Sequence, residues 1–330
     1  MKKVFCSMLA ILLLCVGSLG LVSCGKDNDT IVINEVTHSV FYAPLYLADT
    51  LGYFKEEGIT VEISAAEGSN TSMATLLSNN CDIALAGPET AVYVAAEGST
   101  DNPVVFGQLT KRDGAFLVSK TNIENFSWQR DLRDKTVIAG RAGGLPAMTF
   151  EWVVNNLGMY RNNGITLDTD TSFAMQVPTF EAGTAEFCTM FEPTASEYQA
   201  AGKGYIVASV GEQSGEIPYT CFIAKKAYLK NNSSKIQGFL RAIKKAYTYA
   251  MTTDSEIVAT ELKKSFASSS ISSLKFAVES YTRIDAWMST PAMTESSYNR
   301  LIDVLKNAGT LDENIPFSKV VDNTYAYSVA

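Results

Sequence analysis

Short β-rich runs alternate with helical runs through the first hundred residues. The predicted strands are Ile31–Val36, Thr60–Ser64, Asp82–Ala86 and Val104–Leu109, and the predicted helices are Pro44–Glu57, Ser69–Ser78 and Pro88–Glu97. The third helix has Pro88 at its first position, where the missing N–H costs nothing. Strands that alternate with helices in this way predict crossover units and a mainly parallel sheet.

A second series of the same kind follows Arg112. Its predicted strands are Thr136–Ala139, Ile165–Thr171, Glu186–Met190 and Tyr205–Ser209, and its predicted helices are Pro146–Leu157, Val177–Ala182 and Thr194–Ala201. Beyond a returning strand at Tyr219–Ala224 the pattern is helical over Ser234–Thr252, Ser255–Phe266, Ser273–Met288 and Thr294–Asn307. The fold class is therefore α/β with two lobes, the first from residues 31–108 and 220–330 and the second from residues 109–219. Because ligands bind beyond the carboxyl ends of strands in open α/β sheets, we expect a ligand cleft between the lobes.

The first 24 residues have the three parts of an export signal. Lys2 and Lys3 are basic, residues 4–22 are almost wholly apolar, and Leu21-Val22-Ser23-Cys24 ends the segment. The last four residues resemble a bacterial lipobox, in which the cysteine is acylated and the signal is cut before it. We therefore expect a signal peptide over residues 1–23, lipidation of Cys24, a polar tether over residues 24–30 and attachment to the outer face of the cell membrane. An ordinary secretory signal that happens to contain a cysteine is the alternative.

Charge and cysteine content exclude several classes of protein. The net charge of −8 argues against nucleic acid and against a broad contact with anionic lipid, so the acylated Cys24 is the expected link to the bilayer. Cys81, Cys188 and Cys221 are widely spaced and lack metal-binding or CxxC spacing. They are predicted to be buried apolar residues, although one disulfide pair stays open.

Several stretches together resemble one family. They are the run His38–Phe54 followed by Glu56-Glu57-Gly58-Ile59, Gly68-Ser69-Asn70, Cys81–Glu89, Phe126–Ile138 and Gly140–Pro146. They resemble the NMT1/THI5-like substrate-binding proteins, a group with binders of sulfonates, taurine, nitrate and thiamine precursors. The resemblance implies a type II periplasmic-binding-protein fold, a small-molecule ligand and an ABC permease as partner, with no cofactor.

One departure from this family concerns the ligand. Thiamine-pyrimidine binders of the group carry an Asp-Trp-x-Pro-Asn-x-x-His pattern after the first strand, whereas this chain has Tyr42 where the histidine would fall. The cysteine-rich motif of the eukaryotic pyrimidine synthases is also missing. A nitrogen heterocycle such as a vitamin precursor is the expected ligand, with a sulfonate, taurine or nitrate as the alternative. A surface lipoprotein that binds protein or glycan is an alternative of another class.

Two glycine- or aromatic-rich turns supply candidate ligand contacts. His38, the only histidine, follows the first strand and either faces the cleft or bonds to backbone at the strand end. Tyr42 offers a ring and a hydroxyl, which suit a planar ligand and equally the core of a lobe. Arg141, Gly143 and Gly144 precede a helix whose N-terminal N–H groups attract anions, or else form a tight turn with a solvated arginine.

Two carboxylates follow strands, one in each predicted lobe. Glu89 and Glu192 either accept hydrogen bonds from a ligand or cap the helices that they begin. Ser69 and Asn70 contact a ligand from a helix start, or Ser69 is an ordinary N-cap. Tyr219 lies at the second crossing between lobes and is expected to close over the ligand, whereas Arg112-Asp113 at the first crossing is interpreted as an ion pair that stiffens the hinge.

An enzyme needs residues that this chain barely offers. A single histidine makes any Ser-His-Asp triad depend on His38, and no nucleophile elbow, P-loop or dinucleotide-binding glycine motif is present in the sequence. A closing cleft needs only convergent hydrogen bonds and aromatic surfaces. The sequence therefore predicts a binding protein that performs no chemistry on its ligand.

Overall fold

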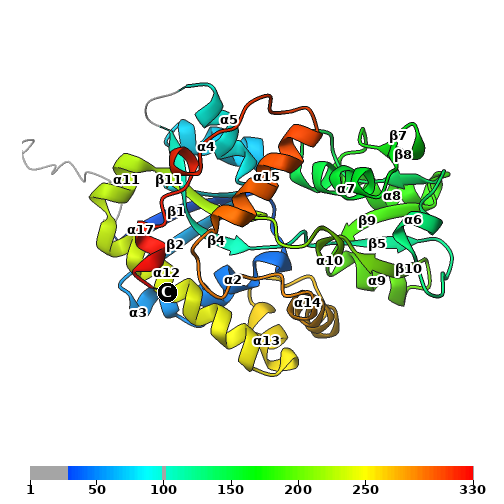
Figure 1. Ribbon diagram of the computed structural model, residues 1–330. Coiled ribbons are helices and arrows are strands. Elements are labelled where there is room, and N and C mark those ends of the chain that lie inside the picture. Colours follow the sequence, from blue (N-terminus) through cyan, green and yellow to red (C-terminus); the bar gives the residue numbers. More distant parts are fainter. Residues whose placement is uncertain (1–28, 99–101, 330) are drawn as a thin grey trace, which may run out of the picture.

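Two β-sheets organise the chain, one in each of two lobes (Figure 1). The computed structural model describes residues 29–98 and 102–329. The predicted signal peptide, the acylated Cys24 and most of the tether lie outside these residues. Thr30, assigned above to the tether, is the first residue of strand β1 and pairs with Thr60.

Lobe 1 contains a five-stranded sheet in the order β2-β1-β3-β11-β4. The strands are β1 (Thr30–Glu35), β2 (Thr60–Ala65), β3 (Ile83–Ala86), β4 (Pro103–Thr110) and β11 (Thr220–Lys225), and the helices between the first four are α2 (Ala43–Thr50), α3 (Tyr53–Glu56), α4 (Ser69–Leu77) and α5 (Glu89–Ala96). β1 is parallel to β2 and β3, whereas β11 is antiparallel to β3 and β4. The mainly parallel sheet expected from the alternating pattern is confirmed.

Lobe 2 contains a six-stranded sheet in the order β10-β5-β9-β6-β8-β7. The strands are β5 (Ala115–Ser119), β6 (Thr136–Ile138), β7 (Tyr160–Arg161), β8 (Gly164–Asp168), β9 (Phe187–Phe191) and β10 (Tyr205–Ser209), and the helices are α6 (Trp128–Asp131), α7 (Leu145–Asn156), α8 (Gln176–Ala182), α9 (Thr194–Ala200) and α10 (Val210–Ser214). β5 is antiparallel to both of its neighbours, β9 and β10. It follows β4 of lobe 1 directly, without an intervening helix.

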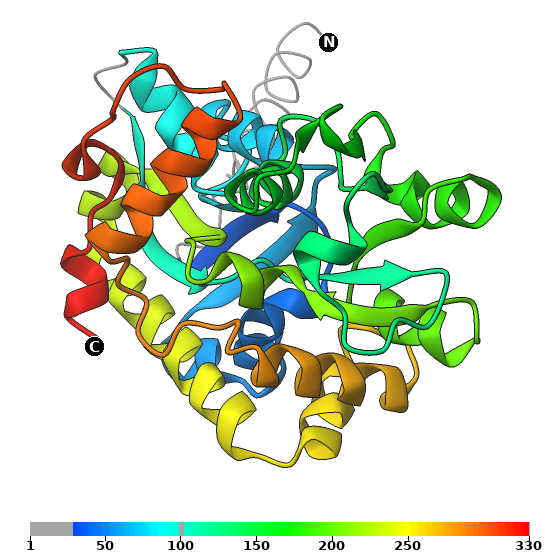
Figure 2. The same ribbon diagram turned by 45° about the vertical axis from the view of Figure 1, so that its right-hand side comes forward.

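The C-terminal helices surround lobe 1 and reach lobe 2 at two places (Figure 2). They are α11 (Lys226–Asn231), α12 (Ser233–Thr252), α13 (Ser255–Leu262), α14 (Ile271–Arg283), α15 (Glu295–Asn307), α16 (Phe317–Val320) and α17 (Thr324–Tyr327). α12 packs on α2 and α3, and α16 and α17 pack on β4. α14 contacts α9 and α15 contacts α7, so both helices link the lobes.

Two neighbouring segments connect the lobes. Residues 111–114 join β4 to β5, and residues 215–219 join α10 to β11. The Ile217 amide donates to the Lys111 carbonyl (3.0 Å) and the Tyr219 amide to the Thr110 carbonyl (3.1 Å), so the two segments run side by side. Lys111 also pairs with Asp285 at 2.7 Å, which ties the hinge to the end of α14.

Several predicted elements end earlier or divide in the structure. The single helix expected over Pro44–Glu57 is two, because Gly52 takes a left-handed conformation (φ 76°) between α2 and α3. Pro88 is the N-cap of α5 and not its first residue. The helix expected to reach Met288 ends at Arg283, two residues before Asp285 takes a positive φ of 52°. β5 was missed, because a five-residue run that is buried throughout has no alternation to reveal it.

Candidate functional site

The carboxyl edge of the lobe 1 sheet faces lobe 2. β4 is parallel to β1 and β3, and its carboxyl end leads straight into the first crossing. The segments that follow β1 and β3 begin at the same edge, and they include the one-turn helix η1 (Val40–Tyr42) and the start of α5. In α/β sheets this edge is where ligands bind.

Five polar residues from separate segments gather in the seam between the lobes. All are buried, with exposed fractions of 0–6 %: Tyr42 of η1, Glu89 of α5, Asp113 and Tyr219 of the two crossings, and Tyr281 of α14. The rings of Tyr42, Tyr219 and Tyr281 lie 5.7, 5.8 and 5.0 Å from the Phe41 ring, measured between centroids. Burial is the largest cause of the raised pKa of Tyr219, and the charges of Asp113 and Glu89 raise it further. These five residues are named here the seam cluster.

The Glu89 carboxyl group lies against the backbone of Gly87. A Cβ on Gly87 would lie only 2.0 Å from Glu89 Oε2, so the carboxyl folds back over that glycine. Burial raises the pKa of Glu89 to about 7, while its own amide and the Ser69 hydroxyl oppose that shift. Glu89 Oε2 is buried and has no hydrogen-bond partner among the described residues. A buried acceptor without a partner requires an explanation, and a ligand donor is one.

Asp113 and Tyr219 bring one polar side chain from each crossing. Asp113 Oδ1 accepts from the Ala115 amide at 2.7 Å, while Oδ2 and the Tyr219 hydroxyl are buried without a hydrogen-bond partner in the described part of the chain. Burial raises the pKa of Asp113 to about 7, and the nearby Tyr219 lowers it by a smaller amount.

Phe41 fills the aromatic centre of the seam. Its ring centroid lies 5.0 Å from that of Tyr281, 5.7 Å from Phe191 of β9 and 5.8 Å from Tyr219. A Cβ on Gly114 would lie 2.7 Å from the Phe41 ring, so the first crossing needs glycine there. Phe191 also stacks edge-on with Phe173, which is 53 % exposed, so the aromatic row extends from the interior to the surface.

Arg141 extends from lobe 2 towards the start of α4 in lobe 1. A Cβ on Gly68, the N-cap of α4, would lie 3.5 Å from Arg141 Nη2. Gly143 has a φ of 73°, and Gly144 caps the N-terminus of α7. The guanidinium is exposed, and the two helix starts offer free N–H groups beside it. This region around Arg141 and the starts of α4 and α7, named here the mouth of the seam, suits an anionic group.

Two residues predicted to bind ligand are engaged by the protein itself. Both ring nitrogens of His38 have protein partners, Glu35 Oε1 at 3.1 Å and the Ser265 carbonyl at 2.9 Å. Glu192 accepts from the Ser196 amide (3.0 Å) and from the Ser280 hydroxyl (2.9 Å), and so caps α9 and ties it to α14. These contacts match the alternatives stated from the sequence: a backbone hydrogen bond for His38 and helix capping for Glu192.

The remaining predicted residues lie beside the seam. Ser69 is the first residue of α4, after Gly68 at the N-cap, and its hydroxyl accepts from the Gly87 amide at 3.1 Å. Asn70 is exposed. Cys81, Cys188 and Cys221 are buried, and Cys188 and Cys221 are free thiols. Tyr281 was not predicted, because it is 239 residues from Tyr42 and no local signal marks it.

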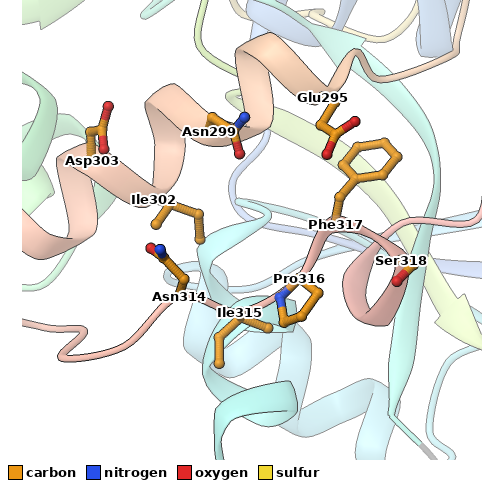
Figure 3. A pocket seen from close by; sticks show the side chains of 9 residues that line it. All are labelled: Glu295, Asn299, Ile302, Asp303, Asn314, Ile315, Pro316, Phe317 and Ser318. Atoms are coloured by element: carbon orange, nitrogen blue, oxygen red, sulfur yellow. The ribbon is translucent and has the colours of Figure 1, made fainter.

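A groove of about 590 Å³ lies elsewhere, between α15 and residues 314–318 (Figure 3). Glu295, Asn299 and Asp303 line it from the helix, and Pro316 and Phe317 from the opposite side. Its polar side chains are exposed, and none of its polar atoms is buried without a partner among the described residues. The seam cluster is therefore the stronger candidate site.

Comparisons with known proteins find one matching family and solved structures of similar fold. Residues 40–257 match the family model described as NMT1/THI5 like. A Bacillus subtilis protein named only as a binding protein, YtlA, is 38% identical over 322 residues, which cover 96% of each chain. The 4-amino-5-hydroxymethyl-2-methylpyrimidine phosphate synthase of Aspergillus parasiticus is 26% identical over 226 residues, 64% of this chain and 63% of that protein. The ligand-binding component of an ABC-type import system from Staphylococcus aureus superposes with a TM-score of 0.69 at 15% identity, over 92% of this chain and 99% of that one.

Proposed function

Because the chain belongs to the NMT1/THI5-like family, we propose that it is the extracytoplasmic substrate-binding protein of an ABC importer. It captures a small molecule between its lobes and hands it to a membrane permease without chemical change. Acylated Cys24 anchors it to the outer face of the cell membrane. The observation that carries this function is the seam cluster between the two lobes. There Glu89 Oε2, Asp113 Oδ2 and the Tyr219 hydroxyl are buried without a hydrogen-bond partner among the described residues, beside two crossings that run in opposite directions.

The ligand that best suits the seam cluster is a nitrogen heterocycle. Glu89 Oε2 and Asp113 Oδ2, which have no hydrogen-bond partner in the part of the chain that the structure describes, would accept from ring or amino N–H groups. Phe41 packs against the three tyrosines of the cluster, and a planar ring that entered the seam would pack on the same aromatic side chains. Tyr42 occupies the position at which thiamine-pyrimidine binders have histidine. At least one contact to the heterocycle is therefore expected to differ from theirs.

A sulfonate, taurine or nitrate is the second candidate, and Arg141 is the observation that favours it. Its guanidinium lies beside the starts of α4 and α7, where helix N–H groups stabilise negative charge. Bound ligand raises the unfolding temperature, so a thermal-shift screen distinguishes the two candidates. A stabilising heterocycle supports the first candidate, and stabilisation by sulfonates or nitrate alone supports the second.

Replacement of Arg141 by alanine sharpens this screen. If the ligand carries an anionic group, loss of one charge-assisted hydrogen bond is expected to weaken binding by about tenfold or more. Stability should change by less than about 0.5 kcal/mol, since the side chain is exposed. Titration calorimetry measures the affinity, and the exposed Arg133→Ala in the same lobe is the control. Equal loss in both variants, or none in Arg141→Ala for an anionic ligand, would remove Arg141 from the site.

A further inference from the structure

Glu89 and Asp113 are two buried carboxyl groups that the proposed function assigns to the ligand without specifying the charge of that ligand. Their side chains are 2 % and 0 % exposed, and each has one oxygen without a hydrogen-bond partner among the described residues. Burial is the largest cause of the raised pKa of Tyr219, and the charges of Asp113 and of Glu89 raise it further, so both carboxyl groups lie near Tyr219. Glu89 comes from lobe 1 and Asp113 from the first crossing.

Neither carboxyl pairs with a cation from residues 29–98 or 102–329. In the described part of the chain no salt bridge engages Glu89 or Asp113, although twelve other ion pairs are present. Arg112, the nearest cationic residue in sequence to Asp113, donates instead to the Gly211 carbonyl. Buried carboxylates are normally paired, because burial of an isolated charge is costly. Burial accordingly raises the pKa of each group to about 7.

The surroundings of the pair favour a particular kind of cation. Tyr42, Tyr219 and Tyr281 supply aromatic faces, which attract cations and pack on flat groups. The free oxygens accept N–H groups and cannot coordinate a metal ion fully, since two carboxyl oxygens are fewer than hard metal ions require. A delocalised organic cation with several N–H donors satisfies both the rings and the oxygens.

We propose that Glu89 and Asp113 together bind the cationic end of a planar nitrogen base, an amidinium or a protonated aminoheterocycle, so that the cleft selects cations over neutral and anionic ligands. This inference rests on the proposed function and specifies the charge of its ligand. Asp113 thereby becomes a ligand contact as well as a hinge residue. Arg141 at the mouth then recognises a substituent and not the cationic end.

The test uses three probes that share a phenyl ring and differ in charge. Titration calorimetry at pH 8 compares benzamidine, benzamide and benzenesulfonate on the mature chain. Benzamidine is expected to bind at least about tenfold more tightly than the other two, since charge-assisted hydrogen bonds replace neutral ones. Glu89→Gln and Asp113→Asn should each reduce benzamidine affinity by about tenfold and leave benzamide affinity within about threefold.

The control is Glu62→Gln, which changes an exposed glutamate of β2 in the same way and should leave every affinity unaltered. Melting curves establish whether the variants fold. If a variant does not fold, the preference of the wild-type protein among the three probes tests the inference by itself. Benzamidine that binds no better than benzamide, or not at all, overturns the inference, as do variants that keep wild-type affinity. None of these results removes the proposed function, which fails only if no small molecule closes the lobes.

Discussion

Replacement of Phe41 by alanine is expected to lower the free energy of unfolding by about 3–5 kcal/mol, the cost of emptying a large aromatic site in a well-packed core. The Phe41 side chain is 1 % exposed and touches rings from both lobes and from α14. Its carbonyl also accepts from Trp287 Nε1 at 2.9 Å, so collapse of the site would disturb the contact with the C-terminal part. Urea denaturation followed by circular dichroism and tryptophan fluorescence measures the loss.

The matched control is Phe276→Ala on α14, whose side chain is 53 % exposed. It should change the free energy of unfolding by less than about 0.5 kcal/mol. A loss below about 1 kcal/mol in Phe41→Ala would contradict the view that this ring joins the packing of the two lobes.

Gly211→Ala adds one methyl group at the hinge and is expected to lower both the free energy of unfolding and the ligand affinity. A Cβ at this position would lie 2.2 Å from the Asp113 carbonyl oxygen and 3.0 Å from Arg112 Cβ. Because the first neighbour is backbone, one of the packed segments must move, which costs about 1–3 kcal/mol. The displaced crossing carries Asp113, so ligand affinity should fall together with stability.

Thermal unfolding and titration calorimetry measure these two effects. Gln213→Ala, an exposed position on the same helix, is the control and should alter neither quantity. A Gly211→Ala variant with wild-type stability would show that α10 and the first crossing are not held in contact in solution.

Much of the fold was predictable because its signals are local. Alternation of β-rich and helical runs identified most strands, and the regularity of those runs indicated two lobes. The family resemblance was likewise carried by short motifs and is confirmed by the match over residues 40–257. Gly52 and Asp285 take positive φ values at helix ends, so these two boundaries also carry local signals.

The site was predictable only in part, because long-range packing decides which polar groups stay free. Tyr42, Glu89 and Tyr219 were identified by position and lie in the seam cluster. His38 and Glu192 stand at equally promising strand ends, but Ser265 and Ser280 reach them from the C-terminal helices. No pattern near His38 or Glu192 could reveal those partners. Asp113 was interpreted as half of an ion pair with Arg112, but Asp113 is buried and Arg112 donates to the Gly211 carbonyl instead.

The central claim is that a small molecule is captured by closure of the two lobes. Small-angle X-ray scattering of the mature chain, recorded without ligand and with each stabilising compound from the thermal-shift screen, tests it most directly. A ligand is predicted to shift the population towards the closed form, with a smaller radius of gyration and saturation at the calorimetric affinity. A radius of gyration that stays constant with every bound compound would contradict capture by closure.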